Sequence, residues 1–204
     1  MTTPTLPTVN SDLGAKATYD LANYKTLEPE ELIARITEVR RQMGDSLLIL
    51  GHHYQQDQVV EHTDLRGDSY QLSEMAAQSD ACRSIVFCGV HFMAETADIL
   101  ANRPEKLESR GGQRVRVILP DMAAGCSMAD MAAIAQVEAA WEDMSEVIDT
   151  ERVIPVTYIN SAASLKAFCG RNGGIVCTSS NAQAVLQWAF ERGDRVFFFP
   201  DQHL

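Results

Sequence analysis

Short apolar runs that alternate with helix-like runs are the feature that most limits how this 204-residue sequence can fold. Six of these runs have the length of a strand, and they lie at residues 46–51, 84–89, 116–119, 153–159, 174–178 and 195–201. Apolar runs this short, bounded by turn residues, are typical of buried strands. Strands that alternate with helices indicate parallel sheets with helices on their faces. The sequence therefore predicts an α/β fold built on short parallel sheets.

The last three runs repeat the first three. The repeat aligns 153–159 with 46–51, 174–178 with 84–89 and 195–201 with 116–119, which places Cys177 on Cys88 and Pro200-Asp201 on Pro120-Asp121. Such self-similarity indicates repeated supersecondary units. We predict a flexible N-terminal arm over residues 1–26 and two three-layer α/β repeats over 27–148 and 149–204. The second repeat stops where the first continues into a loop and a long helix, so we expect the sequence to be a fragment or a shortened form.

Helix boundaries follow from capping signals and apolar spacing. Pro29 suits a first helical position, which predicts a helix over 29–43. Either Asp68 or Ser69 can cap a helix over 70–78. Further helices are predicted at 90–100 and 128–147, with a turn at 64–70 and a polar surface loop at 102–114.

Cys126 lies in a loop of small residues between a predicted strand and the predicted helix that opens behind Ser127. A thiol near a helix N-terminus is favoured as the thiolate, because the backbone N–H groups there stabilise negative charge. The alternative is a buried cysteine that acts as a small hydrophobe. The neighbouring Gly125 and the loop position favour a chemical role.

Composition excludes several classes of protein. The net charge is −11 and no Lys/Arg-rich face is visible, which argues against nucleic acid and anionic membranes as partners. No signal peptide is apparent in the polar N-terminus, and no apolar run could span a bilayer. Five cysteines without a C-x-x-C pair suit free thiols or metal ligation in a reducing cytoplasm.

Polar side chains cluster just past the predicted strand ends in both halves of the sequence. They are His52, Tyr54 and Cys126 in the first half, and Tyr158, Asn160 and Ser179 in the second. In parallel sheets the carboxyl ends of the strands form the edge where ligands bind. We therefore expect His52, Cys126 and Tyr158 to face a common cavity. Ser179 can also be a helix cap, and a helix N-terminus binds carboxylates and phosphates.

Several motifs, in this order along the chain, resemble those of the quinolinate synthase family, the A protein of bacterial NAD biosynthesis. They are GHHYQ at 51–55, GDSYQL at 67–72, FCGVHFMAETADIL at 87–100, LPDMAAGCSMADM at 119–131, YIN at 158–160, CTSSNA at 177–182 and FPDQHL at 199–204. The resemblance covers nearly everything from Leu47 onward.

The resemblance implies three similar α/β domains around a pseudo-threefold axis, two of them in this sequence. It implies a 4Fe–4S cluster held by one cysteine per domain, with an open iron that can act as a Lewis acid. The implied reaction condenses iminoaspartate with dihydroxyacetone phosphate to quinolinate, and L-aspartate oxidase is the implied source of iminoaspartate. By the same resemblance Cys126 is a cluster ligand, Tyr54 and His52 are catalytic, Glu95 is structural, and the substrate-binding residues are His52, Ser69, Tyr158, Asn160 and Ser179.

The family's other two cluster cysteines have no counterpart in this sequence. Cys88 and Cys177 lie within predicted strands, and Cys82 and Cys169 lie in predicted helix-to-strand connections. One thiolate does not hold a cuboidal cluster. We therefore expect this chain alone to bind no cluster and to be inactive.

Two alternatives from other classes remain open at this point. The first is a mononuclear metal hydrolase that uses His52, His91, Glu95 and Asp121, because His91 and Glu95 share a helix face. The second is a non-catalytic two-domain product that binds a dicarboxylate or a phosphate weakly.

Overall fold

The computed structural model of this chain describes residues 22–79 and 81–200. The chain divides into two compact units, residues 1–42 and 43–204. The first unit holds α1 (Ala22–Lys25) and nearly all of α2 (Pro29–Met43), whose bounds are those predicted. Most of the predicted arm over 1–26 lies outside the described residues, but its end forms the single turn of α1.

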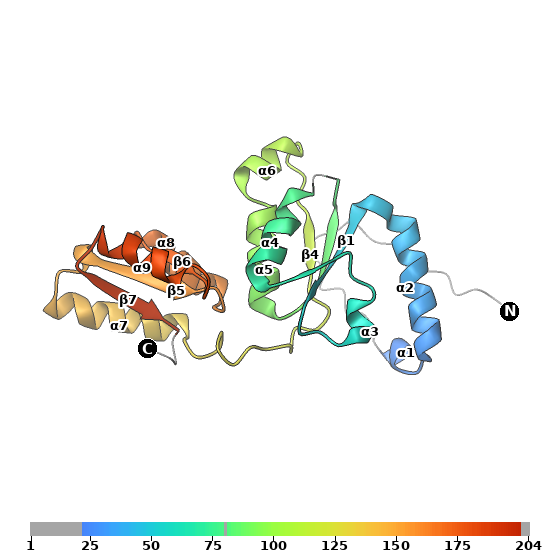
Figure 1. The fold of residues 1–204 in the computed structure, drawn as a ribbon, viewed down its shortest axis with the longest axis horizontal. Coiled ribbons are helices and arrows are strands. Elements are labelled where there is room, and N and C mark those ends of the chain that lie inside the picture. Colours follow the sequence, from blue (N-terminus) through green and yellow to red (C-terminus); the bar gives the residue numbers. More distant parts are fainter. Residues whose placement is uncertain (1–21, 80, 201–204) are drawn as a thin grey trace. The chain divides into compact units, whose positions relative to one another are not determined.

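The described residues form two parallel sheets (Figure 1). The first sheet has the strand order β2-β1-β3-β4. Its strands are β1 (Leu47–His52), β2 (Leu65–Gly67), β3 (Ser84–Cys88) and β4 (Arg116–Ile118), and η1 (Gly44–Ser46) precedes β1. Helices α4 (Ser69–Gln78) and α5 (His91–Ala101) pack together over this sheet, and α3 (Asp57–Val60) contacts β1. Their shared core contains Leu50 and Phe87 from the strands, Leu72 from α4 and Phe92 from α5.

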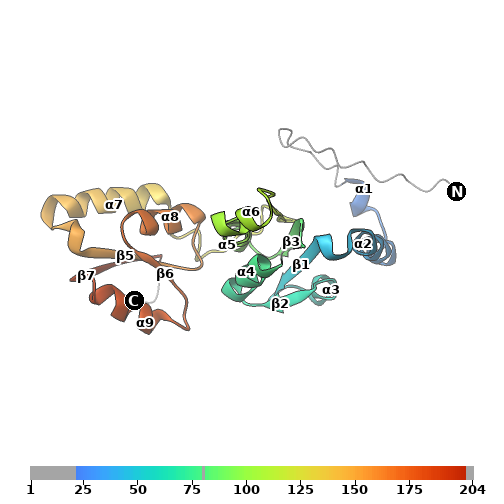
Figure 2. The same ribbon diagram turned by 90° about the horizontal axis from the view of Figure 1, so that it is seen from above.

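The second sheet has the strand order β6-β5-β7 and helices on both faces (Figure 2). Its elements are η2 (Thr150–Arg152), β5 (Val153–Tyr158), β6 (Ile175–Cys177), β7 (Arg195–Phe199), α7 (Ile134–Val147), α8 (Ala163–Arg171) and α9 (Ala182–Phe190). Phe197 and Phe199 pack toward α7 and α8, whereas Val196 and Phe198 pack toward α9. This alternation follows from the two-residue period of a strand and produces three layers. The predicted α/β class with short parallel sheets is confirmed.

The strand registers correct the predicted alignment of the repeat. The last residue of β1, His52, pairs with Gly67 of β2, and the last residue of β5, Tyr158, pairs with Cys177 of β6. The first residues of the same two strands pair with the first residues of β3 and β7. Strand β6 therefore corresponds to β2, and β7 corresponds to β3.

The predicted matches of 174–178 with 84–89, of 195–201 with 116–119 and of Cys177 with Cys88 are consequently wrong. Those matches compared apolar strand sequences, which resemble one another in any parallel sheet. The position of a strand in a sheet is instead decided by the crossover connections, which apolar runs do not encode. Strand β2 has only three residues, and it was predicted as a turn.

Residues 102–114 are not the polar surface loop that was predicted. They contain α6 (Pro104–Ser109), which begins with proline in its first turn and ends before Gly111, whose φ is +64°. Gly112 donates its N–H to Leu107 O at 2.8 Å, as in a Schellman C-cap. Proline at the start and glycine just past the end are sequence signals that identify this helix.

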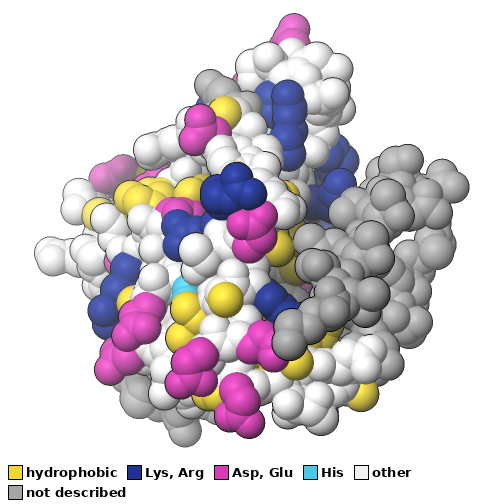
Figure 3. Space-filling model, turned by 90° about the vertical axis from the view of Figure 1, so that its right-hand side faces the viewer, with side chains coloured by type: hydrophobic (Ala, Val, Ile, Leu, Met, Phe, Trp, Pro, Cys, Tyr) yellow, Lys and Arg dark blue, Asp and Glu magenta, His cyan; other side chains and the backbone are white. Residues whose placement is uncertain are grey.

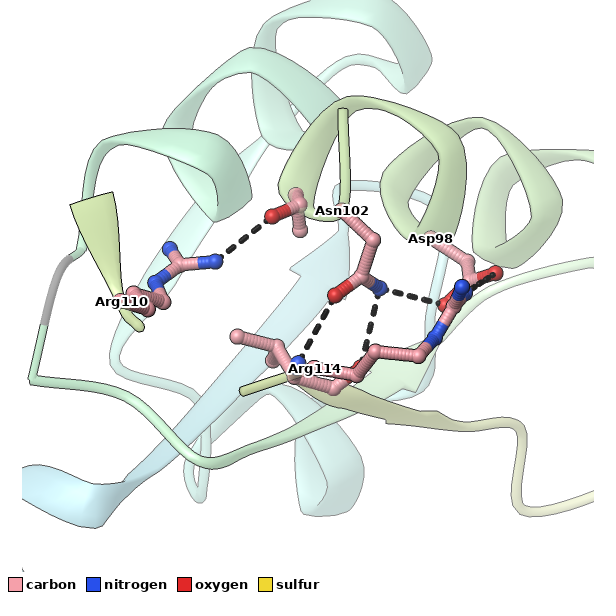
Figure 4. Close-up of polar contacts among 6 residues, drawn as sticks. Asp98, Asn102, Arg110 and Arg114 are labelled. Atoms are coloured by element: carbon pink, nitrogen blue, oxygen red, sulfur yellow. Dashed lines mark hydrogen bonds and ion pairs between the residues drawn. The ribbon is translucent and has the colours of Figure 1, made fainter. Parts of the chain in front are cut away.

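Two buried polar side chains, Asn102 and Arg110, hydrogen-bond this segment to its neighbours (Figure 4). Asn102 Nδ2 donates to Asp98 Oδ1 at 2.8 Å and to Val115 O at 3.0 Å, and Asn102 Oδ1 accepts from Val115 N at 2.8 Å. Arg110 donates to Ala101 O at 2.6 Å and to Ser79 O at 2.8 Å. These carbonyls lie at the C-terminal ends of α5 and α4, where a cation is favourable.

Helix α7 begins at Ile134, and the predicted start at 128 is wrong. Ala129 packs in the core of the first sheet and Ala132 against the core of the second, so the chain crosses between the two cores here. Residues 127–130 form a hydrogen-bonded turn and residues 132 and 133 have no regular structure, so the chain passes from one core to the other without a continuous helix. Gln136 Oε1 then accepts from Ala133 N at 3.0 Å and fixes the helix start.

Acidic and basic side chains are mixed on the face drawn in Figure 3. On α2, for example, Arg35 pairs with Glu31 at 2.6 Å and Arg41 with Glu38 at 2.7 Å. Exposed ion pairs of this kind contribute little to the free energy of unfolding, so they add little to the stability of α2. Among the described residues, no helix is both long enough and apolar enough to cross a bilayer.

Candidate functional site

The carboxyl end of the first sheet carries His52, His53 and Tyr54 in consecutive positions. His52 is the last residue of β1 and only 7% exposed, and its ring lies 4.4 Å from that of His53 and 4.8 Å from that of Tyr54. His53 Nδ1 lies 3.0 Å from Gly67 O of the adjacent strand. Tyr54 is 82% exposed, so its hydroxyl is accessible to a ligand at this edge.

The surroundings of His52 favour its neutral form. Burial lowers the pKa of His52, the neighbouring His53 lowers it further, and Asp68 partly opposes both. Tyr54 donates its backbone N–H to His52 Nδ1 at 3.4 Å. An Nδ1 that accepts a hydrogen bond leaves the proton of the neutral ring on Nε2. His52 can therefore donate one hydrogen bond through Nε2 without carrying a charge.

Ser69, one of the two residues predicted to cap α4, is not its N-cap. Asp68 is the N-cap of α4, and its carboxylate accepts from Gln71 N at 2.8 Å. Ser69 is the first residue of the helix and is half-buried beside the end of β2. Its hydroxyl is therefore not the group that caps α4.

The carboxyl end of the second sheet brings four predicted site residues into two contacts. Tyr158 Oη and Ser179 Oγ share a short hydrogen bond, and Asn160 Nδ2 points to Cys126 Sγ at 3.9 Å. Ser179 is exposed and is not the N-cap of α9, a position that Asn181 occupies. Cys126 is half-buried and packs against the core of the first sheet. The second contact thus joins the loop that follows β4 of the first sheet to the loop that follows β5 of the second sheet.

The corrected alignment of the repeat pairs the predicted site residues with one another. His52 and Tyr158 each end a central strand, and Tyr54 and Asn160 each follow two residues later. Ser69 and Ser179 each follow two residues after the strand that pairs with that end. The predicted match of 153–159 with the first strand already places Tyr158 on His52 and Asn160 on Tyr54, but the equivalence of Ser69 and Ser179 was missed because β6 was aligned with β3. The strand pairings of β1 with β2 and of β5 with β6 are the observation that establishes this equivalence.

Cys126 does not lie at a helix N-terminus, in contrast to the prediction, because α7 starts at Ile134. The residues after it form a turn in which Asp130 N donates to Cys126 O at 3.0 Å. The predicted common cavity for His52, Cys126 and Tyr158 stays a prediction.

The other four cysteines are poor candidates for metal ligation. Cys82, Cys169 and Cys177 are buried and Cys88 is half-buried. Cys169 lies within α8, not in the predicted connection. Burial raises the pKa of Cys82 and Cys88, and it raises the pKa of Cys169 to about 12. Thiols held in the protonated form do not ligate metals readily.

The described part of the chain does not fit a 4Fe–4S cluster. Residues 22–79 and 81–200 contain no group of three His, Cys, Asp or Glu side chains placed to hold a metal ion. The resemblance implies a single cluster thiolate in this chain, that of Cys126, and a cuboidal cluster needs more than one. The same observation removes support from the metal-hydrolase alternative.

A cavity of about 520 Å³ lies beside α5, lined by His91, Ala94, Glu95, Asp98, Val117, Leu119 and Met122. Two of the four proposed hydrolase ligands, His52 and Asp121, are absent from this lining. The carboxylate of a third, Glu95, accepts from Ala163 N at 2.8 Å instead. Glu95 therefore has the structural contact expected of it.

Comparison with known proteins identifies the family. The sequence pattern of the family described as quinolinate synthetase A protein matches residues 34–204. A quinolinate synthase from Rhodopirellula baltica is 77% identical over 203 residues, which cover all of this chain and 52% of that protein. Quinolinate synthases from Corynebacterium glutamicum and a Geobacillus species are 53% and 51% identical, over 89% of this chain and 43% and 47% of those proteins. This chain spans about half the length of these relatives, and it belongs to the quinolinate synthetase A family.

Proposed function

We propose that this chain carries part of the substrate site of a quinolinate synthase, an enzyme that condenses iminoaspartate with dihydroxyacetone phosphate. The contact pair Tyr158–Ser179 and Asn160–Cys126 is the observation that supports this most directly, because it gathers four family-motif residues at strand ends. Both substrates are anions, and hydroxyl, amide and imidazole donors suit carboxylates and phosphates. The division of the chain into two repeats belongs to the same proposal, with the boundary moved from residues 148 and 149 to a position before α7, because Val137 and Trp141 of α7 pack in the core of the second sheet.

Each proposed residue has a role that its chemistry allows. His52, through Nε2, and the hydroxyls of Ser69, Tyr158 and Ser179 would donate hydrogen bonds to substrate oxygens, and Asn160 would add its amide. Tyr54, exposed beside the neutral His52, would exchange protons with the bound substrate. Cys126 is proposed as a cluster ligand of the whole enzyme.

The implied partners and location are also proposals. L-Aspartate oxidase is proposed as the source of iminoaspartate, since an unstable imine is best used where it is made. The proposed cytoplasmic location is supported by the five cysteines, all described, none of which forms a disulfide.

The isolated chain is expected to bind a dicarboxylate weakly through the second-sheet residues. Titration calorimetry with L-malate and, separately, inorganic phosphate measures this. Tyr158→Phe and Ser179→Ala should each weaken the binding of one probe about tenfold, the effect of losing about 1.4 kcal/mol of hydrogen bonding. Ser164→Ala, on the exposed side of α8, is the control and should bind as the wild type does. Equal affinity in all four proteins would refute the assignment.

Iron analysis tests the expected absence of a cluster from this chain alone. After anaerobic reconstitution with iron and sulfide, we expect near-zero iron per chain and no absorbance near 400 nm, because one suitable thiol cannot hold a cuboidal cluster. The Cys126→Ser chain, treated identically, is the control for adventitious iron. About four irons per wild-type chain, lost in that variant, would contradict the expectation.

A further inference from the structure

The segment that carries Tyr158 and Asn160 is fastened to α5 of the first sheet. Glu95 Oε2 accepts from Ala163 N, the first N–H of α8, at 2.8 Å. Lys166 Nζ donates to Ser161 O at 2.5 Å and lies 5.4 Å from the centre of the Phe92 ring. Helices α5 and α8 are in contact. The Glu95–Ala163 bond and the Lys166–Phe92 contact run between elements of the two sheets, whereas the Lys166–Ser161 bond is local to the start of α8.

These links act on the backbone of the site residues. Ser161 Oγ donates to Tyr158 O at 2.7 Å, and Ser161 directly follows Asn160. The Ser161 carbonyl that Lys166 holds is therefore one residue from the amide that contacts Cys126. A small rotation of this backbone would move both the Tyr158 hydroxyl and the Asn160 amide, since both side chains are carried by it. Site geometry of this kind needs support from groups beyond the site.

Lys166 is hard to explain as a stabilising residue. It lies in the early part of α8, where the helix dipole disfavours a cation. Burial lowers the pKa of Lys166 to about 8, with Glu95 partly opposing that effect. Replacement of a buried charge by an apolar side chain is often neutral or favourable. A methionine at position 166 could also pack on Phe92, but only a hydrogen-bond donor at that position can bond to the Ser161 carbonyl.

Glu95 likewise supplies a hydrogen-bond acceptor that the residues at the start of α8 lack. The N-cap residue of α8 is Ala162, whose side chain has no acceptor. The first N–H of the helix is satisfied by a carboxylate from a residue far earlier in the chain. The start of α8 is thereby placed relative to α5, and not only relative to its own loop.

We propose that Glu95 and Lys166 are positioning residues that hold the backbone of residues 158–163 so that Tyr158 meets Ser179 and Asn160 meets Cys126. The expected effect of these residues on ligand affinity rests on the proposed function. The placement of Asn160 against Cys126 can be measured without any ligand.

The test uses two readouts on the full 204-residue chain with the variants Glu95→Met and Lys166→Met, which remove the acceptor for Ala163 N and the donor to Ser161 O. The first readout is the rate at which iodoacetamide alkylates Cys126, followed by mass spectrometry of its peptide. Loss of the Asn160 contact should expose the thiol and raise this rate at least about threefold, because thiol reactivity follows access. The second readout is L-malate affinity, which should fall about tenfold. Urea unfolding verifies that each variant is folded.

Two further variants separate positioning from simple loss of structure. Lys166→Arg keeps a cationic donor over Phe92 and should restore the wild-type alkylation rate, whereas Lys106→Met removes an ammonium group from α6 and should change neither readout. Alkylation rates less than about threefold above wild type in both Glu95→Met and Lys166→Met would overturn the proposal. If wild-type chain fails to bind L-malate, the proposed function fails, and the alkylation rates still decide the positioning role.

Discussion

Gly174→Ala is expected to lower the free energy of unfolding by at least about 3 kcal/mol, because the added methyl group has no space. A Cβ on Gly174 would lie 1.9 Å from Pro155 O and 2.7 Å from Pro155 Cγ. Pro155 is in the middle of β5, the central strand of the second sheet, so its backbone cannot retreat without breaking the pairing on both sides. Gly174 directly precedes β6, which leads to Ser179.

Gly170→Ala is the matched control for this prediction. Gly170 lies inside α8, and a Cβ there meets nothing within 4 Å. Alanine in a helix interior should stabilise by about 0.5–1 kcal/mol relative to glycine. Urea unfolding followed by circular dichroism compares the two variants with the wild type. A Gly174→Ala chain that does not fold agrees with the prediction, whereas a loss below about 1 kcal/mol contradicts it.

Asn102→Asp is expected to destabilise the chain by about 3 kcal/mol at pH 7, although the two side chains have the same shape. Asn102 is 7% exposed and donates Nδ2 to both Asp98 and the Val115 carbonyl. Aspartate would place an oxygen there, facing a carboxylate and a carbonyl oxygen. The bond to Asp98 of α5 and the buried bond to Val115, directly before β4, would both become repulsive contacts.

The pH dependence and a second substitution identify the cause. Burial and the nearby Asp98 should raise the folded-state pKa of the introduced carboxyl above its unfolded value. The folded chain then binds the proton more tightly, so the destabilisation should be small at low pH and grow as the pH rises through the folded-state pKa. Adding Asp98→Asn removes one charge and supplies a donor, and it should recover at least half of the loss. Equal losses in the single and double variants would rule out this explanation.

The sequence was sufficient for the fold class, since strands β1, β3, β4, β5, β6 and β7 all fall within or beside the predicted runs. Helix α2 has the predicted bounds because Pro29 and the apolar spacing specify it locally. The start of α7 could not be predicted, because residues 128–133 favour a helix by composition. They are used instead to reach from one core to the other, which is a tertiary demand that overrides propensity.

The candidate site was predicted in its residues but not in its arrangement. Motif resemblance selected Tyr158, Ser179, Asn160 and Cys126, and the structure adds the two contacts that join them. Lys166 was not selected, because a single lysine in a helix usually faces solvent. Its contact with the Ser161 carbonyl depends on the packing of α8 on α5, which no local pattern encodes.

Quinolinate formation by a chimera is the most direct measurement of the central claim that this chain carries part of the substrate site of a quinolinate synthase. Residues of the Rhodopirellula baltica relative that match this chain are replaced by the chain itself, which is 77% identical to them. The cluster-loaded chimera should form quinolinate from iminoaspartate and dihydroxyacetone phosphate. Its Tyr158→Phe variant should be about 100-fold slower, as for the loss of a preorganised donor, and its Ser164→Ala variant should be unaffected. A folded, cluster-loaded chimera that forms no quinolinate, or one that is indifferent to Tyr158→Phe, would contradict the account.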